Sequence, residues 1–126
     1  MDFLKLFVPT YIIGMLVDFV WLGVVASSLY KTQLGALLRP TTAFTAGHWL
    51  SAALVYVAIV GGSMLFVLPR ATSYGTAALY GALFGLITYA IYELTNYALL
   101  SGWPLTIVFV DIAWGVALGA LTGVVL

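Results

Sequence analysis

Two acidic side chains, Glu93 and Asp111, stand at equal distances from a short break in an otherwise apolar stretch of the sequence. The break covers residues 101–104, in which Gly102 signals a turn and Pro104 suits the first position of a new helix. Glu93 precedes Gly102 by nine residues, and Asp111 follows it by nine. If the flanking segments are helices that fold back on each other, the two acids lie at the same height. The spacing therefore predicts a pair of carboxyl groups inside a helical hairpin.

Neither acid has a basic residue close to it in the sequence. The four Lys and Arg residues of the chain fall outside its long apolar segments. Two carboxyl groups that meet in an apolar interior cannot both stay ionised, so we expect Glu93 and Asp111 to share one proton. We expect His48 or Asn96 to form hydrogen bonds with this pair. Acids placed in this way suit proton exchange or general acid–base chemistry.

A short motif occurs twice and adds a third acid. The pattern V-D-x-x-W is found at residues 17–21 and again at residues 110–114. An Asp and a Trp three positions apart share one face of a helix, so each motif presents an acid and an indole together. A match this short can arise by chance, and Asp18 alone could serve helix packing. The alternative, that both motifs face a common centre, predicts that Asp18 lies close to the acid pair.

The predicted site is a single polar cavity that opens toward the link at residues 30–47. Its candidate residues are acidic, aromatic or otherwise polar: Asp18, Trp21, His48, Tyr92, Glu93, Asn96, Asp111 and Trp114. Trp49 and Trp103 fall at helix ends, where tryptophan commonly marks the membrane interface, and Tyr56 is expected to serve packing. A solvated position at the membrane edge is the alternative for His48. With one His and no Cys in the chain, we expect no metal site and no cofactor.

Glycine residues four apart predict how the two helices of the hairpin pack. Gly81 and Gly85 precede the turn, and Gly115, Gly119 and Gly123 follow it. Counted outward from Gly102, the two sets fall at matching heights. Small residues at this spacing let two helix backbones approach closely. We therefore expect the two glycine rows to meet.

The composition identifies the class of protein. The chain has 126 residues, of which 64% are hydrophobic and only 6% are charged. A soluble domain of this size cannot bury so much apolar surface, so the chain is expected to be an integral membrane protein. Its net charge is zero, which argues against a nucleic-acid partner.

The hydropathy pattern predicts an all-α protein, a four-helix bundle in the membrane. We expect one transmembrane domain over residues 1–126, with helices at about 7–29, 48–68, 74–100 and 104–126. Short links make neighbouring helices antiparallel and bring both termini to one side. The longer link at residues 30–47 is partly amphipathic and is expected at the membrane interface. Lys31 and Arg39 on one side balance Lys5 and Arg70 on the other, so basic residues do not decide the orientation.

Four motifs in the sequence resemble those of a known family. They are D-F-V-W-L-G at residues 18–23, Y-E-L-T-N at 92–96, G-W-P-L at 102–105 and V-D-I-A-W-G at 110–115. In order and spacing they are similar to a family of small bacterial predicted membrane proteins, catalogued as a domain of unknown function. Members more often carry Asp where this chain has Glu93, and their link after the first helix is more basic. The resemblance implies a four-helix membrane protein and no particular reaction.

Three functions fit a membrane bundle with converging acids. We favour a small-molecule carrier or binding protein linked to proton exchange, which with only four helices would form a homodimer or a larger complex. The alternatives are an accessory or structural subunit of a larger membrane complex, and a membrane enzyme using paired carboxyl groups on a lipid or isoprenoid. Because no nucleophile or phosphate-binding basic group accompanies the acids, the sequence leans away from an enzyme. We expect the chain to contact membrane lipid and to cross a bacterial inner membrane several times.

Overall fold

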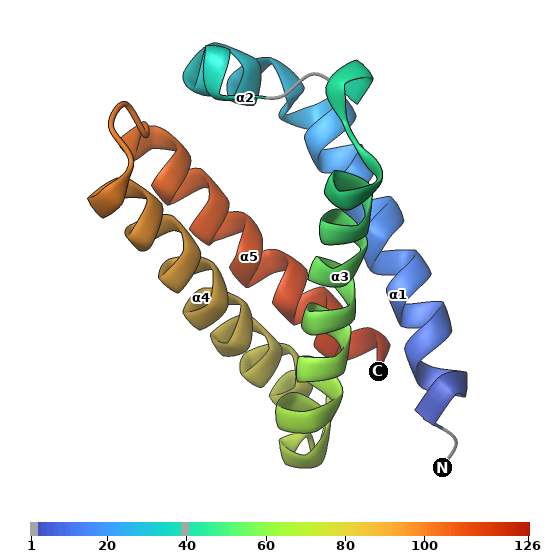
Figure 1. The fold of residues 1–126 in the computed structure, drawn as a ribbon. Coiled ribbons are helices and arrows are strands. Elements are labelled where there is room, and N and C mark those ends of the chain that lie inside the picture. The colour runs from blue at the N-terminus through green and yellow to red at the C-terminus, as the bar shows by residue number, and fades with distance from the viewer. Residues whose placement is uncertain (1–2, 39–40) are drawn as a thin grey trace.

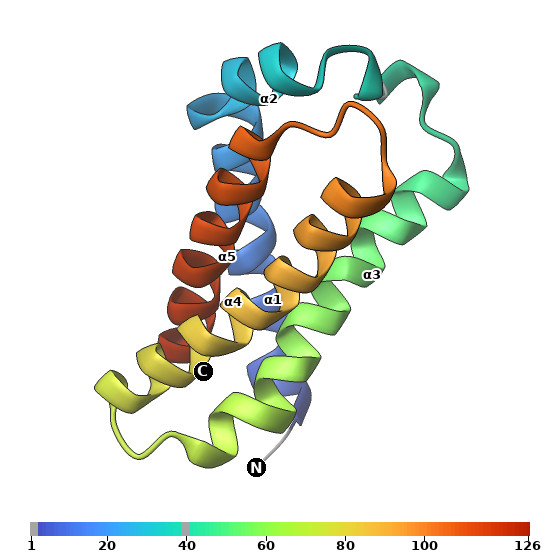
Figure 2. The same ribbon diagram turned by 90° about the vertical axis from the view of Figure 1, so that its left-hand side faces the viewer.

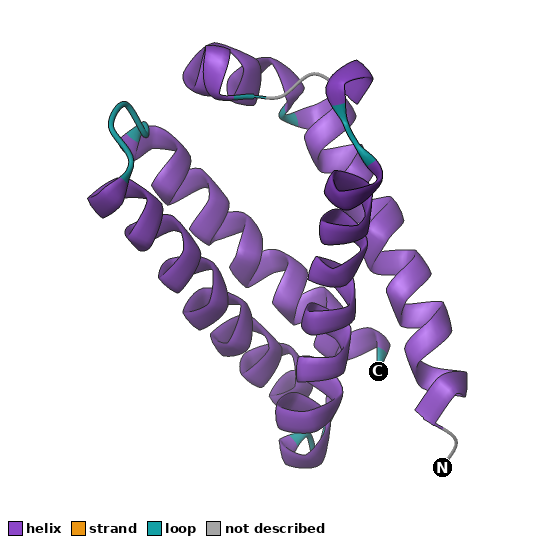
Figure 3. Ribbon diagram, viewed as in Figure 1, coloured by secondary structure: helices purple, strands orange, loops and turns teal. Residues whose placement is uncertain are grey.

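The computed structural model of the chain describes residues 3–38 and 41–126, which are almost entirely helical (Figure 3). The α-helices are α1 (Phe3–Val20), α2 (Ser27–Leu34), α3 (Ala46–Gly62), α4 (Tyr74–Leu99) and α5 (Leu105–Val125). Wider π-helical turns extend α1 over Trp21–Val25 and α3 over Ser63–Val67, and a 3₁₀ turn at Leu68–Arg70 ends the second span. No strand occurs within the two described ranges.

Four helical segments are long and apolar enough to cross a membrane. They are Leu4–Val25, Ala46–Arg70, Tyr74–Leu99 and Leu105–Val125. Both termini lie at the end of the bundle opposite α2 (Figures 1 and 2). The predicted all-α membrane bundle with antiparallel neighbours is confirmed, and the chain is a multi-pass integral membrane protein.

The first span ends four residues earlier than the predicted limit of residue 29. The backbone N–H of Ala26 donates to the carbonyl of Trp21 at 2.7 Å, which closes the π-helical turn, and Ala26 then leaves helical geometry with φ −110° and ψ 8°. α2 begins at Ser27 and runs across the end of the bundle (Figure 1). Residues 22–29 are mostly apolar, so hydropathy alone does not reveal this break.

α2 overlaps the link that the sequence predicts at the membrane interface. It buries Tyr30 against the bundle and exposes Lys31 to the outside. Arg39, the second basic residue expected in this link, lies outside the described residues. The buried and exposed faces of α2 agree with a helix that lies along the membrane surface.

The closest contact between helices is that of α4 with α5, which lie side by side in both views (Figures 1 and 2). A Cβ atom added at Gly81 would overlap the carbonyl oxygen of Gly119, and one added at Gly85 would overlap that of Gly115. A Cβ at Gly123 would overlap the carbonyl oxygen of Ala77. Only glycine leaves room for backbones this close. The two glycine rows therefore set the register of the hairpin.

Replacing Gly85 by Ala tests this backbone contact. The added methyl group meets the carbonyl of Gly115 rather than a flexible side chain, so a helix must shift. We expect the free energy of unfolding in detergent micelles to fall by about 1–3 kcal/mol, the usual cost of overpacking. Gly14→Ala is the matched control, because no atom lies within 4 Å of its added Cβ. Equal stability of the two variants would contradict the contact.

Candidate functional site

All three acids of the membrane spans lie in the half of the bundle nearer α2. Distances along each span, taken at about 1.5 Å per residue, put all three acids on the α2 side of the middle. Asp18 lies about 5 Å, Asp111 about 6 Å and Glu93 about 10 Å from the middle of its span. The turn between α4 and α5 also lies at this end of the molecule (Figure 1). The opposite half of the bundle holds the glycine contacts and apolar side chains. The carboxyl groups of the spans are thus confined to one half of the membrane, whereas the buried polar groups of the other half are the hydroxyls of Thr10, Ser63 and Thr122 among the described residues.

Glu93 is the most deeply buried of the acids. Its side chain is 0% exposed, and its Oε2 accepts a hydrogen bond from the indole N–H of Trp103 at 2.8 Å. Its Oε1 has no donor among the described residues, yet the carboxyl group of Asp111 lies within hydrogen-bonding range of Glu93. An unprotonated Asp111 offers no hydrogen to this oxygen. A proton held between the two carboxyl groups would complete the contact.

Asp111 connects this pair to α2. The hydroxyl of Tyr30 donates a hydrogen bond to Oδ1 of Asp111 and accepts one from the indole N–H of Trp21 at 3.3 Å. Burial, and next the hydrogen bond to Asp111, raise the pKa of Tyr30 above its ordinary value of 10.0. Tyr30 therefore keeps its proton and remains a donor. It packs with Ala26 and Ile107 in a small apolar cluster that seats α2 on the bundle.

Asp18 forms a separate centre that joins three helices. Its Oδ2 accepts a hydrogen bond from the hydroxyl of Tyr56 on α3, and its Oδ1 accepts one from the indole N–H of Trp114 on α5 at 2.9 Å. Only 8% of the residue is exposed. Both oxygens act as acceptors, which is the contact pattern of a carboxylate. α1, α3 and α5 are thus held together through one acid.

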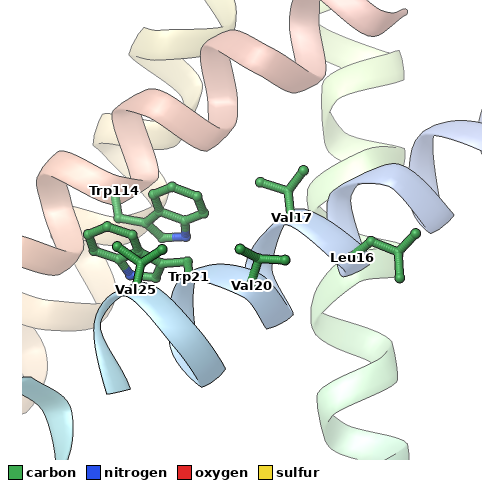
Figure 4. A pocket seen from close by; sticks show the side chains of 6 residues that line it. All are labelled: Leu16, Val17, Val20, Trp21, Val25 and Trp114. Atoms are coloured by element: carbon green, nitrogen blue, oxygen red, sulfur yellow. The ribbon is translucent and has the colours of Figure 1, made fainter. Parts of the chain in front are cut away.

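The two V-D-x-x-W motifs are paired crosswise. Trp114 donates to Asp18, the acid of the other motif, while Trp21 reaches Asp111 through the hydroxyl of Tyr30. The two indole rings stack on each other, with centroids 4.5 Å apart and planes inclined by 3°. Figure 4 shows this stack between α1 and α5. Each helix therefore supplies the indole that serves the acid of its partner.

The remaining candidates lie elsewhere or play other parts. His48 stands in the first turn of α3, where its Nδ1 accepts the backbone N–H of Thr45 at 2.9 Å and completes a capping box. Tyr92 forms a side-chain hydrogen bond with Asn96 and packs edge-on against Trp103, with ring centroids 6.4 Å apart. The sequence predicts His48 or Asn96 as partner of Glu93, whereas the structure places Trp103 there. Trp103 lies in the turn between α4 and α5, and its indole reaches the side chain of Glu93 on α4.

Tyr30, Tyr56 and Trp103 are the site residues that sequence reasoning missed. All three belong to residue types that combine a large apolar ring with a polar group needing a partner when buried. From position alone, the sequence predicts Tyr30 in a link, Tyr56 in helix packing and Trp103 at the membrane interface. The signal that could have found them is the count of acids in the spans, because every buried carboxyl group needs donors.

The structure shows an apolar groove where the sequence predicts a polar cavity. The groove has a volume of about 320 Å³ and lies between α1 and α5 (Figure 4). Its lining residues are Leu16, Val17, Val20, Trp21, Val25 and Trp114. None of them is an acid: Asp18 is hydrogen-bonded to the indole N–H of Trp114, and Asp111 is linked to that of Trp21 through the hydroxyl of Tyr30. Within the described ranges, no three His, Cys, Asp or Glu residues gather in a way that could hold a metal ion.

Replacing Tyr30 by Phe tests the link between α2 and Asp111. The change removes the hydroxyl and leaves the ring. We expect the free energy of unfolding to fall by about 1 kcal/mol, as for other hydrogen bonds between membrane helices, and the amides of α2 to exchange faster with deuterated water. Tyr74→Phe is the control, because Tyr74 is 79% exposed. Unchanged exchange in α2 would show that this bond does not hold it.

The raised pKa of Tyr30 also predicts a pH dependence. The folded chain holds the hydroxyl proton to higher pH than the unfolded chain does. Tyr30 therefore favours folding fully below about pH 10, and this contribution is lost as the pH rises above that value. We expect the stability of the natural chain to fall more steeply above pH 10 than that of Tyr30→Phe. Parallel curves for the two proteins would contradict the prediction.

Comparison with known proteins agrees with this architecture. Residues 3–126 match the family described as "Predicted membrane protein (DUF2177)". No curated protein and no solved structure matches the chain. Because the match extends over almost the whole sequence, the chain belongs to this family of predicted membrane proteins of unknown function.

Proposed function

We propose that this protein is a proton-linked carrier or binding protein for a small molecule, and that Glu93 and Asp111 hold the exchangeable proton between them. The observation that carries the proposal is the Oε1 atom of Glu93, which is buried and has no donor in the described part of the chain, although the side chain of Glu93 lies within hydrogen-bonding range of Asp111. A proton on either acid supplies the missing donor.

The surroundings of the pair favour a single shared proton. Two negative charges in contact in an apolar medium repel each other strongly, and no Lys or Arg of the described residues lies in the middle of a span. Trp103 donates one hydrogen bond, which stabilises one negative charge but not two. The pair therefore has two stable states, with one proton or with two, and a change between them can be linked to binding.

A route for the proton leads toward α2. Tyr30 can both donate and accept a hydrogen bond, so its hydroxyl can pass a proton between Asp111 and the membrane surface. Trp103 and Trp21 have indole N–H groups that only donate, so they hold the acids in place without relaying protons. Tyr30 is 7% exposed on the buried face of α2, and the residue after it, Lys31, is exposed on the outer face. Proton exchange on this side agrees with the position of the acids.

The bundle itself favours a carrier that works as more than one copy. Four spans leave few helices to surround a path across the membrane, so a homodimer or a larger complex would complete it. The acids do not line the groove, so a lipid there would contact aliphatic side chains and the indoles of Trp21 and Trp114, which argues against an enzyme that attacks lipid with these carboxyl groups. We place the protein in a bacterial inner membrane, because helical bundles rather than barrels occupy it.

Replacing Glu93 by Gln tests the shared proton. The amide copies the shape of the protonated acid and supplies a donor toward Asp111, so we expect the fold and the thermal stability to change little. Infrared difference spectra between low and high pH should show a carboxylic acid C=O band in the natural chain that Glu93→Gln removes. Asp111→Asn should abolish or shift the same band.

The control and the contrary result follow from the same spectra. Asp18→Asn changes an acid outside the pair and should leave this band in place. If the natural chain shows no such band, or if Glu93→Gln and Asp111→Asn remove two independent bands, the acids do not share a proton. Glu93→Leu should also lower stability, because it leaves Asp111 without its partner.

A further inference from the structure

The groove between α1 and α5 combines two features that are rarely found together. Its outer residues are apolar and exposed, with exposed fractions of 55% for Leu16, 53% for Val20 and 66% for Val25. These residues belong to the first span, so lipid surrounds them. Its inner wall is the stacked pair of Trp21 and Trp114. A molecule that enters from the lipid therefore meets aromatic surface at the bottom.

The wall of the groove is electronegative although it carries no charge. The face of an indole ring is the negative part of its quadrupole and attracts cations. Trp114 donates its N–H to Asp18, and Trp21 donates to Tyr30, which in turn donates to Asp111, so the N–H edge of each indole is linked to an acid, directly or through one hydroxyl. The described basic residues, Lys5, Lys31 and Arg70, lie near the ends of the spans rather than at the groove. A cation here would meet the two indoles and aliphatic side chains, and none of the described basic residues lines the groove.

We infer that this groove binds a lipophilic monovalent organic cation, with the Trp21–Trp114 stack as its seat and Asp18 as the nearest counter-charge. Apolar substituents of such an ion suit the side chains of Leu16, Val20 and Val25, and its charge suits the indole faces. A neutral acyl chain would fill the apolar part equally well but would gain nothing from the acids. The inference rests on the proposed function, for which it names the class of ligand.

Tetraphenylphosphonium and tetraphenylborate form the sharpest pair of probes, because they have nearly the same shape and opposite charge. Equilibrium dialysis of each ion against the full chain in detergent micelles, with empty micelles as the blank, measures binding directly. We expect saturable binding of the phosphonium and at least about tenfold weaker binding of the borate. Equal binding of the two ions would show that the groove selects for apolar shape alone and would overturn the inference.

Variants place the site. Trp114→Leu removes one indole face and should weaken phosphonium binding about tenfold or more, while Trp114→Phe keeps an aromatic face and should retain much of it. Asp18→Asn removes the counter-charge and should weaken binding several-fold. Trp49→Leu is the matched control, because it removes an indole that is 50% exposed on α3 and does not line the groove. Equal effects of Trp49→Leu and Trp114→Leu would contradict the site.

The result can be told apart from failure of the proposed proton pair. Phosphonium binding is measured at constant pH and does not depend on the infrared band of Glu93. Binding without release of protons into an unbuffered solution would support the groove and contradict proton linkage. A normal Glu93 band with no difference between the two ions would leave the pair intact and refute the cation site. The Trp114→Leu variant must keep the elution volume in size-exclusion chromatography and the circular dichroism spectrum of the natural chain. If this variant unfolds, the difference in binding of the two ions to the natural chain tests the cation site.

Discussion

The backbone contact between α4 and α5 is the constraint on which the rest of the structure depends. The glycine rows bring the two helices so close that the register between them has no freedom, and Gly115 leaves room for the ring of Tyr89. In that register Glu93 meets Asp111 inside the hairpin. A slip of one helical turn would shift the two acids by about 5 Å relative to each other and separate the buried carboxyl group of Glu93 from Asp111, which is costly in an apolar medium.

Hydrogen bonding in an apolar medium explains how the other helices are attached to this hairpin. Asp18 receives donors from α3 and α5, and Asp111 receives one from α2. Each bond between membrane helices contributes only about 1 kcal/mol or less, but the alternative for each acid is an unpaired polar group in lipid. The acids therefore add little to the stability of the bundle. Their main effect is to specify which helices contact one another. The crosswise pairing of the V-D-x-x-W motifs is the clearest result of this requirement.

The same arrangement separates the acids from the groove, two features that the sequence predicts in one cavity. The acids lie inside, where they are held by Tyr and Trp donors, and the groove lies outside, where its lining is apolar and aromatic. The two indoles connect the acids and the groove, because their N–H groups donate toward the acids and their rings line the groove. For the proposed carrier, this geometry would couple proton binding and ligand binding through Trp21 and Trp114 without direct contact between ligand and acid.

The sequence by itself determined the features that depend on composition and spacing. Its apolar runs specified four membrane helices, its glycine spacing indicated the α4–α5 contact, and the equal distances of Glu93 and Asp111 from Gly102 predicted that they would meet. Only the tertiary structure decided which donors serve each acid, because Trp103, Tyr30 and Tyr56 reach their partners through the folding of a turn, a broken helix and a neighbouring span. Hydropathy could not show the break at Ala26, since the residues around it are apolar in either conformation. These contacts depend on distances across the bundle, which the order of residues along one helix does not contain.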